Sequence, residues 1–311
     1  MFDYDAQRPR YTPWSQLSIL LLLCGFGLII GSLVSFFIAS VTLHVSLQNL
    51  ADALKNADNA NLSRLIQFIS TFFFMALPSF VFARMMNKRP FEYIGFNGAI
   101  SGKQVFLIIA IIFMGLFVSE TLGQLNEIIP IPKSLEDYFR GLENEYTEEM
   151  MAIANMKSVQ DYILSLVMIA LLPAIFEEML FRGALQPIMI NFTRNAFLGI
   201  FLTSILFSAI HMSYYGFLPR LALGLMIGYI FYFSKNLWLS SITHFLYNAF
   251  GVSQMYALSM RGQLTADALN DSAVPILYGL LATASIFIIF NYFKRESEVV
   301  ISMYNFHKRK V

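Results

Sequence analysis

The feature that most constrains this chain is a series of long apolar segments separated by short polar ones. Eight such segments occur in the 311 residues, and most reach the ~20 residues needed to cross a bilayer. They cover about residues 15–43, 63–84, 103–124, 160–185, 196–214, 218–234, 237–257 and 275–293. Because a lipid-exposed backbone must satisfy its own hydrogen bonds, each segment is predicted to be a helix. We therefore expect an all-α polytopic membrane protein with about eight transmembrane helices.

The composition agrees with this class. Hydrophobic residues make up 57% of the chain and charged residues only 13%, a balance that excludes an ordinary water-soluble domain. The first apolar segment is much longer than the ~7–15 apolar residues of a cleaved signal sequence, so we expect a retained signal anchor. The single cysteine, Cys24, lies inside that segment and excludes an intrachain disulfide. The net charge of +1 gives no reason to expect a nucleic-acid partner.

The distribution of Lys and Arg between the segments predicts the orientation. If both termini are cytoplasmic, the inner side holds 14 of the 21 basic residues and the outer side 7. This excess is what the positive-inside rule describes. We therefore expect an integral, multi-pass protein with both termini in the cytoplasm, which places it in the plasma (inner) membrane if the host is a bacterium.

Three parts are predicted along the chain. Residues 1–158 would form N-terminal transmembrane helices and an acidic outer loop, residues 159–257 a compact helical core, and residues 258–311 a closing transmembrane helix with a basic cytoplasmic tail. The outer loop at 125–159 contains the acidic sequence SLEDYFRGLENEYTEEMMAIANM and is expected to form one or two surface helices. A solvated cap and a lid or substrate-docking element are both compatible with its composition.

The core segment contains four side chains that could perform acid, base or metal chemistry. Glu177 and Glu178 are adjacent in one of the most apolar stretches of the chain, LSLVMIALLPAIFEEMLFRGAL. An ionised carboxylate that faces hydrocarbon costs at least ~2.5 kcal/mol, so the pair must face a polar cavity or a partner. His211 and His244 follow in later apolar segments, whereas the other two histidines lie outside the membrane segments. Two imidazoles and two carboxylates in one hydrophobic core indicate a functional site.

Helix geometry predicts that three of these side chains meet. Glu177 lies 17 residues before Arg194 and His211 lies 17 residues after it, in a hairpin that turns near residues 191–195. Both would therefore lie ~25 Å along their helices from the turn. His244 lies 9 residues after the next turn at Lys235, or ~13 Å along its helix. If the first turn extends ~10 Å beyond the inner membrane surface, all three side chains lie at one level.

The spacing of charged residues separates the roles of the two glutamates. Glu178 and Arg182 are four residues apart and face each other on a helix, so their pairing would neutralise one buried carboxylate. Glu177 points ~100° away and remains available for the site. A second interpretation of Arg182 is that it extends to the inner membrane surface, as long basic side chains near helix ends often do.

Two further pairs have the same spacing. Phe207 shares a helix face with His211, and His244 shares one with Asn248, so an imidazole and a carboxamide can address one point. Ordinary packing for Phe207 and a helix–helix polar contact for Asn248 are the structural alternatives.

The three motifs together resemble a known family. Glu177-Glu178-x-x-x-Arg182, Phe207-x-x-x-His211 and His244-x-x-x-Asn248 occur in this order on successive hydrophobic segments, with Gly183 directly after the arginine. This pattern resembles the CPBP intramembrane proteases, which join CAAX prenyl endopeptidases to bacterial bacteriocin-processing and self-immunity proteins of the Abi group. The resemblance covers about residues 160–255. It implies a hydrolase that cleaves a peptide bond inside the membrane, with its catalytic core in helices 4 to 7.

The resemblance also implies roles for these residues. Glu177 and His211 would hold and activate a water molecule, His244 and Asn248 would bind the oxyanion or complete the site, and Glu178, Arg182 and Phe207 would support them. In a metalloprotease version, His211, His244 and Glu177 bind zinc. In a metal-free version, Glu177 is itself the general base. The expected substrate is a membrane-associated or lipid-anchored peptide or protein, and the sequence does not indicate whether it is prenylated.

Other functions fit the sequence less well. No H-E-x-x-H or Gly-x-Gly-Asp motif occurs, and serine residues in membrane helices usually serve packing. A proton-coupled transporter would use the same Glu and His residues as a relay, but no inverted repeat or matched pair of broken helices is evident. A catalytically silent scaffold, such as an immunity or regulatory protein, would have little need for four aligned polar groups.

Overall fold

The computed structural model describes residues 11–153, 156–265 and 274–308, and within these ranges the chain is helical and contains no strand. The long helices are α1 (Pro13–Leu43), α3 (Ala60–Thr71), η3 (Phe72–Ala76), α4 (Leu77–Met86), α6 (Gly102–Glu127), α8 (Val159–Ser165), η4 (Leu166–Leu171), α9 (Leu172–Glu178), η5 (Met179–Leu185), α10 (Gln186–Thr193), α11 (Ala196–Ala209), α12 (Phe217–Ser234), α13 (Leu237–Met260) and α15 (Ile276–Lys308), where α3–η3–α4 and α8 to α10 are continuous. The connections contain η1 (Leu47–Asn49), α2 (Leu50–Leu54), η2 (Ala57–Asn59), α5 (Pro90–Tyr93) and the polar helix α7 (Lys133–Ile153).

All eight segments predicted to be helical are helical, but only six helices within the described ranges are long and apolar enough to cross a membrane. The two that fall short are α11 and α13. With 14 residues, α11 spans ~21 Å against a hydrocarbon core of ~30 Å, and it ends at Ala209 rather than near residue 214. α13 has 24 residues, but polar side chains such as Ser240, Thr243 and His244 lower its hydropathy. Both helices are connected with the candidate site, because His244 lies in α13 and His211 lies two residues beyond the end of α11.

Three π-helical segments each lie just before a proline. Pro78 follows η3, Pro173 follows η4 and Pro187 follows η5. A proline removes one backbone donor, and its ring clashes with the carbonyl four residues earlier, which in each case belongs to the π-helical segment. The wider turn relieves this clash without ending the helix. As a result η5 begins directly after Glu178 and contains Arg182.

Two tight turns join helices of the core, and both use the same local chemistry. Arg194 and Lys235 adopt left-handed backbone conformations with φ of 52° and 53°, and an asparagine follows each of them. The Asn195 side chain accepts a hydrogen bond from the backbone N–H of Leu198, and that of Asn236 accepts one from Trp238. These side chains cap α11 and α13, which fixes the directions in which both helices start.

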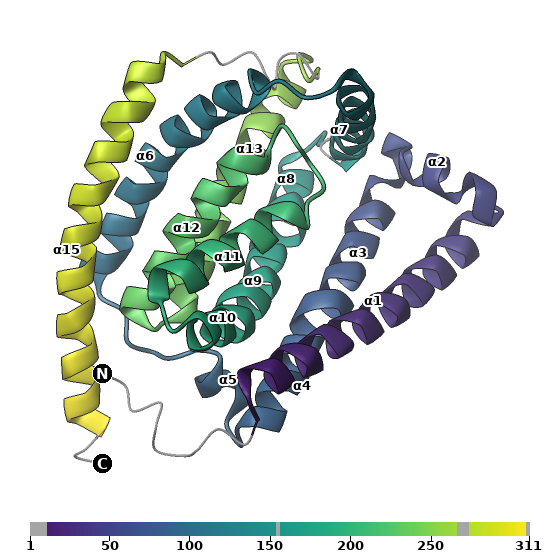
Figure 1. Cartoon of the computed structure of the whole chain (residues 1–311). Coiled ribbons are helices and arrows are strands. Elements are labelled where there is room, and N and C mark those ends of the chain that lie inside the picture. Colours follow the sequence, from purple (N-terminus) through teal and green to yellow (C-terminus); the bar gives the residue numbers. More distant parts are fainter. Residues whose placement is uncertain (1–10, 154–155, 266–273, 309–311) are drawn as a thin grey trace.

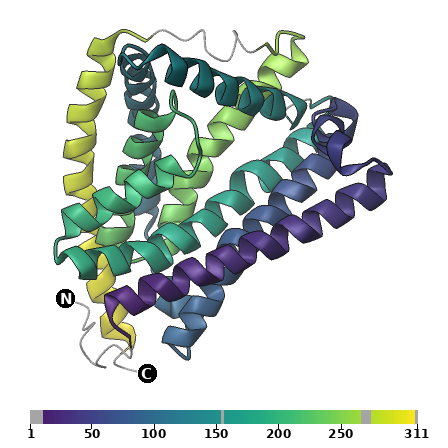
Figure 2. The same cartoon turned by 45° about the vertical axis from the view of Figure 1, so that its right-hand side comes forward.

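The helices form three groups that lie side by side (Figure 1). α1 and the α3–α4 helix form a pair at one side, α6 and α15 pack together at the other, and the helices from α8 to α13 lie between them. The turned view in Figure 2 shows the same order, with α1 coming forward along the outside of α3. α1 begins, and α15 ends, at one end of the molecule, while α7 crosses the opposite end.

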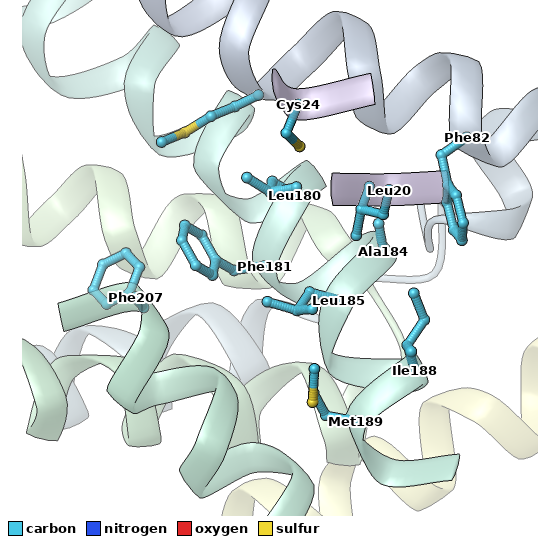
Figure 3. Close-up of a cluster of buried hydrophobic side chains, with 11 residues drawn as sticks. Leu20, Cys24, Phe82, Leu180, Phe181, Ala184, Leu185, Ile188, Met189 and Phe207 are labelled. Carbon is cyan, nitrogen blue, oxygen red and sulfur yellow. The ribbon is translucent and has the colours of Figure 1, made fainter. Parts of the chain in front are cut away.

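Helices from all three expected parts share hydrophobic cores. In one cluster, Leu20 and Cys24 of α1 pack with Leu180 and Ala184 of η5, and the cluster continues through Phe181 to Phe207 of α11 (Figure 3). A second cluster joins α6, α12, α13 and α15 through buried Ile, Leu, Met and Phe side chains. The core helices are therefore packed against α1, α6 and α15, which lie outside residues 159–257. The buried contacts between these helices contribute to the stability of the core.

Candidate active site

The centre of the site is a fully buried ion pair. Glu178 closes α9 and Arg182 lies one turn later in η5, with side chains 0% and 1% exposed. Arg182 Nη1 donates to Glu178 Oε1 at 2.8 Å, and Arg182 Nη2 donates to the carbonyl oxygen of Gly224 at 3.0 Å. The predicted pairing is therefore present, and Arg182 does not extend to the membrane surface. Burial of both partners without lipid contact explains how this apolar helix tolerates them.

Glu178 also fixes His244 of α13. The His244 Nδ1 atom lies 2.9 Å from Glu178 Oε1, and the ring is 4% exposed. Arg182 Nη1 donates to the same Oε1 atom, so this carboxylate oxygen acts as an acceptor and we assign the proton of the bond to Nδ1. In a neutral ring, the Nε2 atom of His244 then carries a lone pair. A carboxylate that holds one ring nitrogen sets both the tautomer and the ring orientation.

His211 is held by a different device. It lies two residues beyond α11, and its Nδ1 atom donates to the backbone carbonyl of Phe207 at 2.8 Å. The Nε2 atom of this imidazole therefore also carries a lone pair. The next residue, Met212, has a φ of 52°, which is an uncommon backbone conformation for a side chain of this size. The sequence predicted a helix at His211, and the structure places it in a turn instead.

Glu177 brings the two histidines together. Its Oε2 atom lies 3.9 Å from His211 Nε2 and 3.9 Å from His244 Nε2, so the predicted convergence of three side chains from separate helices is confirmed. Glu177 is 12% exposed and His211 is 26% exposed, which leaves the site accessible from the His211 side. The Oε2 atom is enclosed and has no hydrogen-bond partner within the described residues.

Three acceptor atoms therefore face one another. Glu177 Oε2 and both Nε2 atoms carry lone pairs, and such atoms repel unless a donor or a cation lies between them. A water molecule ~2.8 Å from two atoms that are 3.9 Å apart fits this spacing and can donate to both. Chemically, this arrangement can hold and polarise one water molecule.

The same atoms fit a zinc ion less well. Zinc bound at ~2.0–2.2 Å with tetrahedral angles holds its ligand atoms ~3.4 Å apart, whereas these pairs are separated by 3.9 Å. Within the described part of the chain, no group of three or more His, Cys, Asp or Glu side chains is arranged to hold a metal ion. A shared metal would require the side chains to move closer together.

Phe207 and Asn248 occupy different positions relative to this centre. Phe207 is 1% exposed, and its ring lies edge-on to both imidazoles at centroid distances of 5.2 and 5.6 Å. The Arg182 guanidinium lies 4.7 Å from the centroid of the same ring. Asn248 lies one turn beyond His244, is half-buried, and makes no hydrogen bond among the described residues. The structure brings Phe207 into the cluster and leaves the Asn248 carboxamide uncommitted.

The sequence did not predict the role of two glycines of α12 that lie against the helix containing Arg182 and Gln186. Gly224 and Gly228 of α12 expose carbonyls to Arg182 and Gln186, with both donor–acceptor distances at 3.0 Å. A Cβ atom on Gly228 would lie 2.7 Å from Ile200 and 3.0 Å from the Gln186 side chain. The signal was present, because small residues four apart in an apolar helix are typical of close helix–helix contacts.

Sequence reasoning also missed the residue that holds the loop after His211. Asn126, at the end of α6, is 2% exposed. Its amide donates to the Tyr214 carbonyl at 2.9 Å, and its side-chain oxygen accepts from the Leu218 backbone N–H at 3.2 Å. One carboxamide therefore binds both ends of this loop. No sequence pattern links Asn126 to residues 88 and 92 positions away.

Together, these features define a multi-pass helical membrane protein with a carboxylate–imidazole site enclosed by its core helices. Residues 159–250 match the family model described as Type II CAAX prenyl endopeptidase Rce1-like. The matched residues contain all three motifs, so the resemblance to the CPBP intramembrane proteases noted in the sequence is confirmed. No curated protein and no solved structure matches the chain. The family match supports an intramembrane endopeptidase in general.

Proposed function

We propose that the protein hydrolyses a peptide bond of a membrane-associated or lipid-anchored substrate, with Glu177 as the general base. The observation that carries this proposal is the position of Glu177 Oε2, 3.9 Å from the Nε2 atoms of both His211 and His244. A water molecule between these atoms donates to the carboxylate and to an imidazole. Its oxygen lone pair is then directed away from all three and toward a substrate carbonyl.

Each of the three groups has a separate task in this mechanism. Glu177 removes a proton from the water as it attacks the carbonyl carbon, and then returns this proton to the leaving amine. His211, oriented by the Phe207 carbonyl, holds the water. His244 lies against Glu178, so any positive charge that develops on its ring is stabilised by a fixed carboxylate. Arg182 holds the Glu178 carboxylate in place through the hydrogen bond at 2.8 Å.

Asn248 is the proposed donor to the oxyanion. The tetrahedral intermediate places a negative charge on the former carbonyl oxygen, and a preorganised donor is needed there. The Asn248 amide lies one turn from His244 on α13 and has no competing hydrogen bond among the described residues. This assignment follows from its uncommitted amide and from the motif that it completes.

The role of zinc is decided by measurement on purified protein. Metal analysis of the protein in detergent, combined with chelator treatment, distinguishes the two versions of the chemistry. The metal-free mechanism predicts substoichiometric zinc and unchanged cleavage after chelation. Stoichiometric zinc together with loss of cleavage on chelation would instead assign Glu177, His211 and His244 as ligands, after a closer approach than the present spacing.

The proposed activity is tested directly with the full-length protein in proteoliposomes. A library of membrane-anchored peptides is incubated with the protein, and new termini are identified by mass spectrometry. A protease produces new termini that are absent with an inactive variant. A silent scaffold or a proton-coupled transporter produces none, so an absence of new termini across the library would count against the proposed function.

A further inference from the structure

Arg220, near the start of α12, has a guanidinium group that lacks a counter-ion among the residues that the structure describes. Its side chain forms no ion pair and no hydrogen bond with the described residues, and its Nη1 atom is enclosed. The contact that it does make is with the aromatic ring of Tyr146 on α7, at 5.6 Å from Cζ to the ring centroid. A guanidinium with an enclosed nitrogen normally has hydrogen-bond partners, because loss of hydration is otherwise uncompensated.

The guanidinium group of Arg220 lies against the loop that follows His211, at Gly216. A Cβ atom on Gly216 would overlap Arg220 Nη1 and lie 2.7 Å from Cζ, so only glycine at 216 accommodates the guanidinium in this position. The group therefore lies between the loop and α7. The loop itself is only five residues long, since α12 begins at Phe217, so it joins His211 directly to the helix that carries Arg220.

The carboxylates of this region are bound to other groups. Glu143 on α7 accepts a hydrogen bond from the Ser213 hydroxyl at 2.8 Å. Glu120 on α6 accepts one from the Gln124 amide at 3.4 Å. Neither forms an ion pair with Arg220. The charge of Arg220 is thus available to an anion that arrives from outside the protein.

We propose that Arg220 forms a subsite for a carboxylate of the peptide substrate, adjacent to the bond that is cleaved. The planar guanidinium offers parallel N–H donors that match a carboxylate in bidentate geometry, and a charged hydrogen bond in a poorly hydrated site is strong. The carboxylate comes from the C-terminus of the substrate or from an acidic side chain near the cleavage site. The inference rests on the proposed function and adds an electrostatic preference to it.

The test compares three membrane-anchored peptides of otherwise identical sequence. One has a free C-terminal carboxylate, one has a C-terminal amide, and one has the amide plus an acidic side chain near the cleavage site. We expect the wild-type protein to cleave at least one of the two anionic peptides with a kcat/KM about 10–100-fold above that of the neutral peptide. Which of the two is preferred identifies the source of the carboxylate.

Substitution of the arginine tests its part in this preference. In Arg220→Gln the ratio of kcat/KM between anionic and neutral peptides should fall toward one, and Arg220→Lys should retain part of it. Because each ratio is measured within one variant, differences in protein amount cancel. Arg140→Gln is the matched control, since Arg140 lies on α7, contacts Tyr215 and already pairs with Glu136 at 2.9 Å. It should keep the wild-type ratio.

A binding measurement separates this inference from the proposed chemistry. Anionic and neutral peptides are titrated into Glu177→Gln and into Glu177→Gln/Arg220→Gln, and the affinities are compared by fluorescence anisotropy. Tighter binding of the anionic peptide only when Arg220 is present supports the subsite. Equal cleavage and equal affinity for all three peptides in the wild type, or a preference that survives Arg220→Gln, overturns it. Absence of any cleavage by the wild type, with the binding preference retained, counts against the proposed function alone.

Discussion

At the scale of single residues, the two adjacent glutamates have opposite environments. Glu178 accepts hydrogen bonds from Arg182 and from His244 and is completely buried. Glu177 is partly exposed, and its Oε2 atom faces two imidazoles that already donate elsewhere. One carboxylate is therefore held by two partners, and the other is the carboxylate that we propose as the base. Adjacent positions on a helix make this possible because they point ~100° apart.

Glu177→Gln should remove the proposed base without changing the size of the side chain. General base catalysis contributes typically ~10²–10⁴-fold to a rate, and we expect cleavage of a membrane-anchored peptide to fall by at least that lower factor. The rate is measured in proteoliposomes with equal amounts of inserted protein. Glu120→Gln is the matched control, because it removes another carboxylate from a membrane helix outside the site. Near-wild-type cleavage by Glu177→Gln would show that another group is the base.

Arg182→Met should destabilise the protein, because it leaves Glu178 buried without its cation. Removal of one partner from a buried ion pair typically costs ~3–5 kcal/mol. We expect the midpoint of thermal unfolding in detergent to be clearly lower than that of the wild type. Tryptophan fluorescence monitors the unfolding.

The double variant Glu178→Leu/Arg182→Met distinguishes stability from catalysis. Replacing both partners by apolar groups of similar size is often neutral, so the double variant should unfold at a higher temperature than the single one. It should nevertheless remain inactive, since His244 then loses the carboxylate that orients it. Recovery of activity together with stability would show that Glu178 has no role in positioning His244.

At the scale of elements, interruptions of regular helix place the site. The wide turns of η5 carry Arg182, and α11 ends just before His211, whose neighbour Met212 has a left-handed backbone. The prolines next to the π-helical segments and the short loop after α11 therefore change the backbone geometry at the site residues, where a regular helix would keep a constant spacing. The loop after His211 is secured from outside the matched residues 159–250, by Asn126 and by the face of α7 that contacts Ser213, Tyr214 and Tyr215.

Asn126→Leu should lower activity through His211. This change keeps the size of the side chain but leaves the Tyr214 carbonyl and the Leu218 N–H without a partner, at ~1–3 kcal/mol for each group that stays buried. We expect at least a ~10-fold loss in kcat/KM, and a milder loss in Asn126→Asp, which keeps the acceptor. Peptide cleavage and thermal unfolding are measured together. Gln124→Leu, on the same helix, is the control and should remain close to wild type.

At the scale of the whole molecule, the connections that the distribution of basic residues assigns to opposite sides of the membrane lie at opposite ends of the molecule. The α4–α6 connection, which contains Lys88, lies at the end of the molecule where α1 begins, and the α1–α3 connection lies with α7 at the opposite end (Figure 1). The helices that enclose the site come from both sides of the matched segment, and they share its hydrophobic cores. The expected division of the chain into three parts stays a prediction about its domains.

Cysteine labelling tests the proposed cytoplasmic location of both termini. Cys24 is the single cysteine, so Cys24→Ala provides a background without thiols. Asp52→Cys and Lys88→Cys, both at exposed positions, are then treated with a membrane-impermeant maleimide. Asp52→Cys should react in intact cells, and Lys88→Cys only after permeabilisation. The reverse pattern would show that the orientation predicted from the basic residues is wrong.

The sequence was sufficient to predict several parts of this protein in physical terms. Apolar length predicted the helices, because a backbone in lipid has few alternatives. The spacing of Glu178 and Arg182 predicted their pairing, because helical periodicity acts over one turn. The convergence of Glu177, His211 and His244 followed from counting residues along the helices from the turns at Arg194 and Lys235. His211 nevertheless lies beyond the end of its helix.

The sequence by itself determined the class of structure and the identity of the three motifs, since hydrophobicity and helical periodicity are local properties. Only the tertiary structure decided that the Gly224 carbonyl accepts from Arg182, that Asn126 secures the loop after His211, and that Arg220 forms no ion pair with the described residues. These contacts join residues far apart in the chain. They depend on how helices pack against one another, and side-chain packing in three dimensions leaves no periodic trace in the sequence.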